Sequence, residues 1–183
     1  MITGTPANFD FLPALPEIAL LVAACIVLMV DLVLPEIRRK WSYWLTQLGV
    51  VATAWLSLYI FHESPAHTFG NTFVADALAD VLKFLSCVTV ALTLAYSRSY
   101  LTARGLFRGE TFALMMFALL GMMVMISANH FLLLYLGLEL MSLSLYAMIA
   151  LQRESGQAIE AAMKYFDLGA LSAGLLLYGM SMI

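Results

Sequence analysis

Long apolar runs dominate this chain, and short polar stretches separate them. Each run is close to the roughly 20 residues that an α-helix needs to cross the hydrocarbon core of a bilayer. The expected fold is therefore an all-α, polytopic membrane helix bundle. The pattern predicts six spans, over residues of about 14–34, 42–61, 76–96, 110–127 and 130–151, and from about 158 to Ile183.

The composition supports a membrane protein. Hydrophobic residues make up 63% of the chain and charged residues only 11%, whereas a soluble domain is about 25% charged. The net charge is −3 and no long basic or acidic run occurs, which argues against a nucleic-acid partner. Cys25 and Cys87 lie inside apolar runs, so we expect two small buried hydrophobic residues rather than a disulfide or a metal site.

Positive charge alternates between the two ends of the predicted bundle. The loops 62–75 and 127–129 carry no Lys or Arg, and Lys83 and Lys164 fall inside predicted helices. Because positively charged loops remain in the cytoplasm, we expect the N-terminus outside and the positive loops inside. The other three loops hold the remaining seven basic residues, which are Arg38, Arg39, Lys40, Arg98, Arg104, Arg108 and Arg153.

The fifth predicted helix carries a single acid near its middle. Glu139 lies about nine residues from the helix start, or roughly 14 Å at 1.5 Å per residue. A charge at the bilayer centre costs at least about 2.5–3.5 kcal/mol, and such residues usually mark functional sites. Tyr135, Ser142 and Tyr146 share its face at spacings of three and four, where they could hold water and modulate Glu139.

The sixth predicted helix carries Glu160, Lys164 and Asp167 on one face. The preceding loop is short, so helices five and six should be antiparallel neighbours whose polar faces can meet. An ammonium about 8 Å from Glu139 would stabilise its carboxylate by roughly 2 kcal/mol, which would make Glu139 and Lys164 a coupled pair for proton transfer. Asp167 could instead pair with Lys164, or lie level with Glu139 and favour its protonated form.

A third charged set lies near the outer end of the third predicted helix. Asp76, Asp80 and Lys83 share one face there. Because these residues are within a few turns of the membrane surface, we interpret Asp80 and Lys83 as a structural ion pair. We interpret Glu160 in the same way.

Two segments resemble a known family. Residues 127–155, "SANHFLLLYLGLELMSLSLYAMIALQRES", and 159–183, "IEAAMKYFDLGALSAGLLLYGMSMI", are similar to the antiporter-like membrane subunits of the proton-pumping NADH:quinone oxidoreductase, respiratory complex I. The run "LGLELMSLSLYAMIAL" resembles the subunit N family more than subunits L and M or the Mrp-type antiporters. The resemblance is weaker over residues 1–105.

The resemblance implies a larger architecture. The family fold has about fourteen spans and two inverted repeats of five helices, the first of which begins at helix four. Residues 1–109 would then be the three N-terminal helices, and 110–183 the start of the first repeat, helices four to six. The chain is accordingly expected to be a fragment of a longer protein.

The resemblance also assigns roles to two residues. In the family a glutamate on helix five acts with a lysine on helix seven, and a lysine on helix six joins them; Glu139 and Lys164 match the first and last. Asp167 stands where the family usually has an apolar residue, and Ser144 where proline is common.

The implied function is proton translocation coupled to electron transfer from NADH to quinone. NADH, flavin, iron–sulfur clusters and quinone are expected on other subunits, with no cofactor and no metal on this chain. The expected partners are other membrane subunits, the lipid bilayer and protons, in a bacterial inner membrane. The alternatives are a cation/proton antiporter subunit of the same superfamily and a structural fragment without transport of its own.

Overall fold

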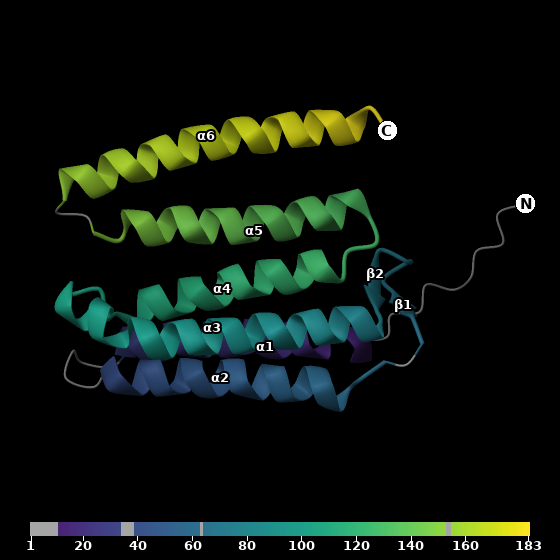
Figure 1. The fold of residues 1–183 in the computed structure, drawn as a ribbon, viewed down its shortest axis with the longest axis horizontal. Helices are drawn as coiled ribbons and strands as arrows, with labels where there is room; N and C mark the ends of the chain where they lie inside the picture. Colours follow the sequence, from purple (N-terminus) through teal and green to yellow (C-terminus); the bar gives the residue numbers. More distant parts are fainter. Residues whose placement is uncertain (1–10, 34–38, 63, 153–154) are drawn as a thin grey trace, which may run out of the picture.

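The computed structural model describes residues 11–33, 39–62, 64–152 and 155–183. The described residues form six α-helices that run side by side along one axis (Figure 1). A 3-10 turn and two short strands complete the fold. In chain order the elements are η1 (Leu12–Ala14), α1 (Leu15–Val33), α2 (Arg39–Tyr59), β1 (Ala66–Thr68), β2 (Phe73–Ala75), α3 (Ala77–Ala103), α4 (Gly109–Ile126), α5 (Phe131–Ala150) and α6 (Gly156–Ser181).

The six predicted helices are all present, with three corrections. The predicted loop 62–75 contains a short β-hairpin within the otherwise all-α fold. Helix α3 continues to Ala103, well beyond the predicted end at 96, and Arg98 is therefore on a helix. Helix α6 begins slightly earlier than predicted because the Ser155 side chain caps it, accepting a hydrogen bond from the Ala158 N–H at 3.3 Å. Arg38 and Arg153 lie outside the described residues.

Four of the helical segments are long and apolar enough to cross a membrane by length and composition, namely Leu12–Val33, Ala77–Ala103, Gly109–Ile126 and Phe131–Ala150. Helices α2 and α6 are also long enough, at 21 and 26 residues, but are not apolar enough over that length to be counted with these four. They nevertheless lie alongside the others, α2 against α1 and α3 and α6 mainly against α5. The fold is therefore that of a multi-pass membrane bundle.

Helix α2 accommodates its polar residues by hydrogen bonding within the helix. The hydroxyls of Thr46, Thr53 and Ser57 are buried and donate to carbonyl oxygens one turn earlier, at 2.8, 2.9 and 3.0 Å. Such bonds satisfy a hydroxyl without a partner from another element. Polar side chains on α2 are therefore compatible with a position inside the bundle.

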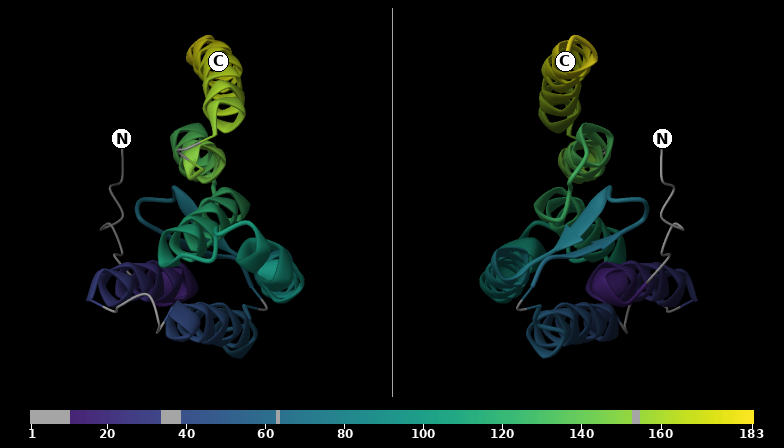
Figure 2. Two further views of the ribbon diagram at one scale, coloured as in Figure 1. Left: turned by 90° about the vertical axis from the view of Figure 1, so that its left-hand side faces the viewer. Right: turned by 90° about the vertical axis from the view of Figure 1, so that its right-hand side faces the viewer.

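Helix α4 is the centre of the packing. It contacts α1, α2, α3 and α5, and in the end-on views α5 and then α6 follow outward from it (Figure 2). Inside a membrane such contacts stabilise mainly through van der Waals packing, because lipid tails are as apolar as the side chains themselves. The fully buried core residues include Leu20, Val27, Val50, Leu94, Met116, Leu119 and Met123.

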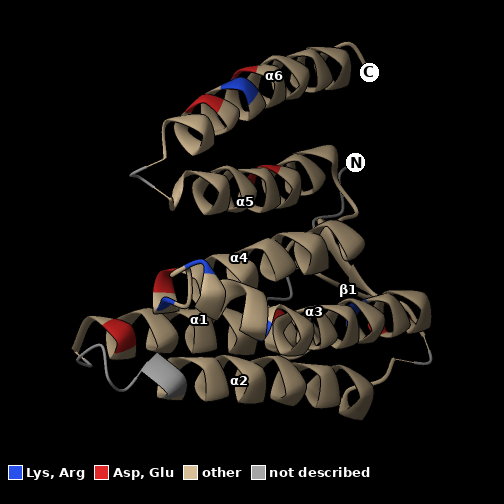
Figure 3. Cartoon of the chain, turned by 60° about the vertical axis from the view of Figure 1, so that its left-hand side comes forward, with Lys and Arg blue, Asp and Glu red and all other residues tan. Residues whose placement is uncertain are grey.

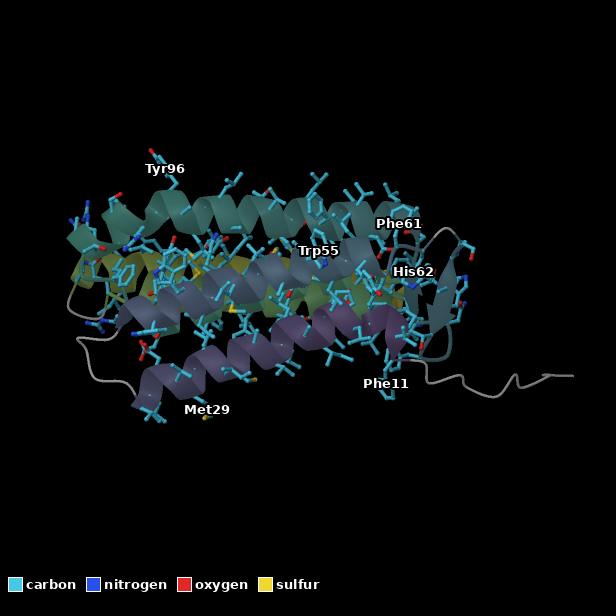
Figure 4. The ribbon with its side chains drawn as sticks, turned by 90° about the horizontal axis from the view of Figure 1, so that it is seen from below. Phe11, Met29, Trp55, Phe61, His62 and Tyr96 are labelled. Carbon is cyan, nitrogen blue, oxygen red and sulfur yellow. The ribbon has the colours of Figure 1, made fainter. Side chains whose placement is uncertain are left out.

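The outer surface of the bundle is apolar, as expected for helices that face lipid. Met29, Trp55 and Tyr96 point away from the helices (Figure 4) and are 65%, 72% and 90% exposed. Cys87 is buried, as predicted, but Cys25 is exposed on this surface, so the prediction for Cys25 was wrong. A cysteine inside an apolar run can face lipid as easily as protein, and the run itself does not distinguish the two.

The hairpin closes one end of the bundle. Strands β1 and β2 pair antiparallel, and Phe73 bridges to Ala128 in the turn between α4 and α5. The Val74 N–H donates to the Ser127 carbonyl at 2.9 Å. The Asn129 N–H donates back to the hairpin, also at 2.9 Å. The end of the bundle formed by the hairpin, the start of α1 and α3 and the α4–α5 turn is called the hairpin end below.

Helices α4 and α5 cross with their backbones in close contact. A Cβ atom added to Gly121 would lie 2.6 Å from the Gly137 carbonyl oxygen and 2.6 Å from the Met141 nitrogen. One added to Gly137 would lie 2.9 Å from the Gly121 oxygen. Small residues allow this approach in membrane helices, so the two glycines determine where α5, and with it Glu139, lies against the core.

Replacing Gly121 with Ala should push α4 and α5 apart, because the added methyl meets backbone atoms that cannot move aside. Overpacking of this kind costs about 1–3 kcal/mol or more. We expect a lower midpoint of thermal unfolding for the full-length protein in detergent. Gly174→Ala on α6 is the matched control, since its Cβ would meet nothing within 4 Å. Equal midpoints for the two variants would contradict the close crossing.

Candidate functional site

Glu139 lies in the middle of α5, eight residues or about 12 Å after Phe131. Its Oε1 atom is buried and has no hydrogen-bond partner among the described residues. An unpaired carboxyl oxygen in an apolar interior is costly, so a position like this is retained only where another interaction or a function compensates. The structure thus places Glu139 as the sequence predicts.

The residues that share the Glu139 face have different surroundings. The Tyr135 phenol is close enough to interact electrostatically with the Glu139 carboxyl group. Ser142 is half-buried. Ser144, on the side of α5 that packs on α4, donates its hydroxyl proton to the Leu140 carbonyl at 2.7 Å. Among the residues predicted to modulate Glu139, Tyr135 is the one whose side chain the described structure brings close to the Glu139 carboxyl group.

Tyr146 connects α5 to α6 by packing. Its ring meets those of Tyr165 and Phe166 edge-on, with centroid distances of 4.9 and 5.8 Å. Its hydroxyl occupies the space that a side chain at position 169 would fill, which Gly169 leaves open. Edge-to-face aromatic contacts of this kind add about 0.5–1.5 kcal/mol beyond buried area. The structure therefore supports a positioning role for Tyr146.

Lys164 is paired within its own helix. Its Nζ atom lies 2.6 Å from Oε1 of Glu160, one turn earlier, and the two side chains are 71% and 65% exposed. No ion pair within 4.0 Å joins Glu139 to a base in the described part of the chain. Lys164 thus pairs with Glu160 rather than with Glu139 or Asp167, and this pair is exposed and lies within one helix rather than buried between two.

Helix α6 presents these charges on an open surface. No described residue of α6 is buried, and Asp167 is exposed like Lys164. Charged positions are sparse along the rest of the bundle, as Figure 3 shows. An exposed carboxylate and ammonium at this depth need protein or water around them rather than lipid.

The charged set on α3 differs from the prediction. Lys83 does not pair with Asp80; it pairs with Glu17 of α1 at 2.6 Å. Asp80 instead accepts a hydrogen bond from the backbone N–H of His62 at 2.9 Å. The same Asp80 oxygen lies 2.9 Å from the ring Nδ1 of His62. The predicted Asp80–Lys83 pair was wrong because helical spacing shows which residues share a face but not which neighbouring helix that face meets.

Sequence reasoning overlooked Glu17. It stands in the first turn of α1 and is 6% exposed, and an acid inside the first apolar run was the available signal. Asp76 has a local role, because its carboxylate caps α3 by accepting from the Ala79 N–H at 2.7 Å. No group of three or more His, Cys, Asp and Glu residues in the described ranges is arranged to hold a metal ion.

Two family models match adjacent parts of the chain. Residues 19–126 match the model described as NADH-ubiquinone oxidoreductase chain 4, amino terminus. Residues 128–183 match the transmembrane model described as NADH:quinone oxidoreductase/Mrp antiporter. The models meet at the α4–α5 turn, and together they cover almost all of the helical bundle.

Curated relatives agree with this family. Subunit N of NADH-quinone oxidoreductase from Nitrosomonas europaea is 55% identical over 95% of this chain, and that from Thiobacillus denitrificans 54% over 95%. In both cases the chain spans 36% of the length of the relative.

Solved structures show the same fold. Respiratory complex I from Thermus thermophilus with bound aureothin matches 90% of this chain and 35% of the other, with a TM-score of 0.73 and 32% identity. The archaeal membrane-bound sulfane sulfur reductase matches 93% of this chain and 36% of the other, with a TM-score of 0.76 and 19% identity, which shows the fold alone. This chain therefore belongs to the antiporter-like family of NADH:quinone oxidoreductase membrane subunits, and the curated relatives that it resembles are subunits N.

Proposed function

We propose that this chain is part of a proton-translocating membrane subunit of an NADH:quinone oxidoreductase, in which Glu139 takes up and releases protons. The observation that carries the proposal is the carboxyl oxygen of Glu139, buried midway along α5 without a hydrogen-bond partner in the described structure. Similarity to subunit N over 95% of the chain supports it. A group that exchanges protons must avoid being fixed in one state by a permanent ion pair.

We infer that Lys164 is the base that acts on Glu139. It comes from the neighbouring antiparallel helix, and it lies about 12 Å from the start of α6, whereas Glu139 lies about 12 Å from the opposite end of the bundle. A lysine side chain is long and flexible, so Lys164 could turn from Glu160 toward α5. At about 8 Å and an effective dielectric near 20 this would stabilise the Glu139 carboxylate by roughly 2 kcal/mol. Movement of one ammonium would thereby drive protonation and deprotonation.

The exposed charges of α6 support the presence of further membrane protein beyond this helix. Glu160 and Lys164 are mostly exposed, and Asp167 is exposed as well. Lipid would not solvate these groups, whereas helices of the same protein or of other subunits could. The proposed partners are therefore other membrane subunits, together with the bilayer and protons. NADH, flavin, iron–sulfur clusters and quinone would be bound by other subunits.

The arrangement of the connections supports the proposed orientation. The C-terminal ends of α1, α3 and α5 lie at one end of the bundle, opposite the hairpin (Figure 1). Arg104 and Arg108 are at that end. By the positive-inside rule it would face the cytoplasm of a bacterial inner membrane, and the hairpin end would face outward. The division into residues 1–109 and 110–183 remains a prediction.

A second candidate is a cation/proton antiporter subunit, because the model that matches residues 128–183 also describes Mrp antiporters. Copurification separates the two functions. Association with NADH-oxidising peripheral subunits supports the oxidoreductase, whereas sodium-dependent proton exchange without electron transfer supports the antiporter. A segment without transport of its own would show neither property.

We predict that Glu139→Ala in the full-length subunit lowers NADH-driven proton uptake severalfold and that Glu139→Asp has a smaller effect, because only the aspartate retains a carboxyl group. Proton uptake by membrane vesicles is measured relative to the amount of assembled complex. Glu110→Gln, an exposed acid at the start of α4, is the control and should pump normally. Full pumping by Glu139→Ala would remove Glu139 from the proton path.

Asp167→Val should be tolerated in assembly, because Asp167 is exposed and forms no ion pair among the described residues. The measurement is the amount of complex recovered from membranes, with Ser172→Val, an exposed position on the same helix, as the control. Loss of assembly in Asp167→Val alone would show that Asp167 has an essential partner outside this chain.

Labelling of single cysteines tests the orientation. In a background with Cys25 and Cys87 replaced by Ala, His67→Cys on β1 should react with a membrane-impermeant reagent added to intact cells. Ala103→Cys at the end of α3 should react only after the membrane is opened. Both positions are exposed, so accessibility within the fold is matched. The reverse labelling pattern would overturn the proposed orientation.

A further inference from the structure

A second cluster of ionisable side chains lies buried at the hairpin end. Glu17 comes from the start of α1, Asp80 and Lys83 from the start of α3, and they are 6%, 2% and 0% exposed. His62 follows the end of α2, beside the hairpin (Figure 4), and its side chain keeps 17% of its surface exposed. Three segments of the chain thus bring four titratable groups together, and one of them reaches the surface.

The contacts order these groups from the surface inward. The His62 ring contacts Asp80 through Nδ1 at 2.9 Å, and the His62 backbone N–H donates to the same oxygen. The carboxyl groups of Asp80 and Glu17 are close enough to repel each other. Glu17 in turn contacts Lys83 at 2.6 Å, and the Lys83 ammonium lies 5.1 Å from the centre of the Phe73 ring. His62 and Asp80 are thus in contact, as are Glu17 and Lys83, and the electrostatic interaction between Asp80 and Glu17 links the two pairs.

The hydrogen-bonding groups of the cluster have fewer partners than a purely structural ion pair would be expected to have. Both carboxyl oxygens of Glu17 and the Lys83 Nζ are buried, and none has a well-aligned hydrogen bond within the described residues, although the two charges are in contact. An ammonium has three protons to donate, and here it meets one carboxyl group and one aromatic ring. Buried pairs with unmet hydrogen-bonding groups contribute little to stability and are often replaceable by apolar residues.

The charges of the cluster do not balance. With Glu17 and Asp80 ionised and Lys83 charged, the formal sum is −1 when His62 is neutral. One additional proton anywhere in the cluster brings the sum to zero, which a low-dielectric interior favours. Two other titratable groups of the described residues lie near the cluster and are not counted in this sum. Asp76 is engaged in capping α3, and the Cys87 thiol, one turn deeper, is buried. The hairpin contributes the Phe73 ring rather than a charge.

We propose that Glu17, His62, Asp80 and Lys83 form a proton-exchange site at the hairpin end, with His62 as the group that meets solvent. Water delivers a proton to one ring nitrogen of His62 while Nδ1 gives its proton to Asp80, so the ring stays neutral and one proton enters the cluster. The carboxyl groups of Asp80 and Glu17 hold it, and Lys83 keeps the cluster within one charge of neutrality. The use of this site rests on the proposed function, because it would exchange protons between the bundle and the aqueous phase at the hairpin end.

The test uses His62→Asn in the full-length subunit of the assembled complex. The asparagine amide can replace the Nδ1 contact to Asp80 but cannot relay a proton. We expect normal assembly, slower NADH-driven proton uptake, and a ratio of rates at pH 6 and pH 8 that changes by about twofold or more, because uptake then no longer passes through a side chain that can gain and lose a proton. His67→Asn, an exposed histidine on β1 of the same hairpin, is the matched control and should leave the ratio unchanged.

A paired variant separates proton exchange from ion-pair packing. Glu17→Leu with Lys83→Met removes both charges and keeps the volume apolar. A purely structural pair would give an assembled complex with full pumping and an unaltered pH profile. The proposal expects an assembled complex with reduced pumping.

The His62→Asn variant decides the question even if the paired variant fails to assemble. Unchanged pumping and an unchanged pH profile in an assembled His62→Asn complex would overturn the proposal. That result would leave the role of Glu139 intact. Conversely, full pumping by Glu139→Ala together with a shifted profile in His62→Asn would overturn only the proposed role of Glu139.

Discussion

The absence of water from the hydrocarbon core is the constraint on which this structure depends. Backbone groups satisfy it by forming helices, and a charged side chain satisfies it only if another protein group or trapped water is beside it. Buried hydroxyl groups find a partner within their own helix, as when the Thr46 hydroxyl donates a hydrogen bond to the Ser42 carbonyl oxygen. The few ionisable residues inside the bundle are therefore the positions where the chain departs from the apolar pattern, and their partners show what they do.

Glu17 and Glu139 meet this constraint in different ways. Glu17 is in contact with Lys83 across the α1–α3 interface, so its charge is compensated even though its hydrogen bonding is incomplete. Glu139 has no base beside it within the described residues, and only the Tyr135 phenol interacts with it. In the proposed mechanism the compensated cluster near the surface exchanges protons with solvent, whereas the uncompensated carboxyl group of Glu139 is charged transiently through Lys164.

The packing of the helices determines where Glu139 and Lys164 lie. Helix α4 holds α1, α2 and α3 together, and its close crossing with α5 through Gly121 and Gly137 fixes α5 against this core. Helix α6 is held mainly by α5, through contacts such as those of Tyr146. The helix that carries Lys164 is thus the least constrained of the six described, which is consistent with a lysine that changes partner.

The sequence itself determined the number, order and approximate bounds of the helices and the position of Glu139 midway along its helix, because the length of an apolar run and the place of a charge within it are local properties. The pairing of Lys83 with Glu17, of Asp80 with His62 and of the hairpin with the α4–α5 turn was decided only by the tertiary structure. Helical spacing puts residues on a common face but contains no information about which distant segment packs against that face. The same reason explains why Lys164 was expected near Glu139 and lies beside Glu160.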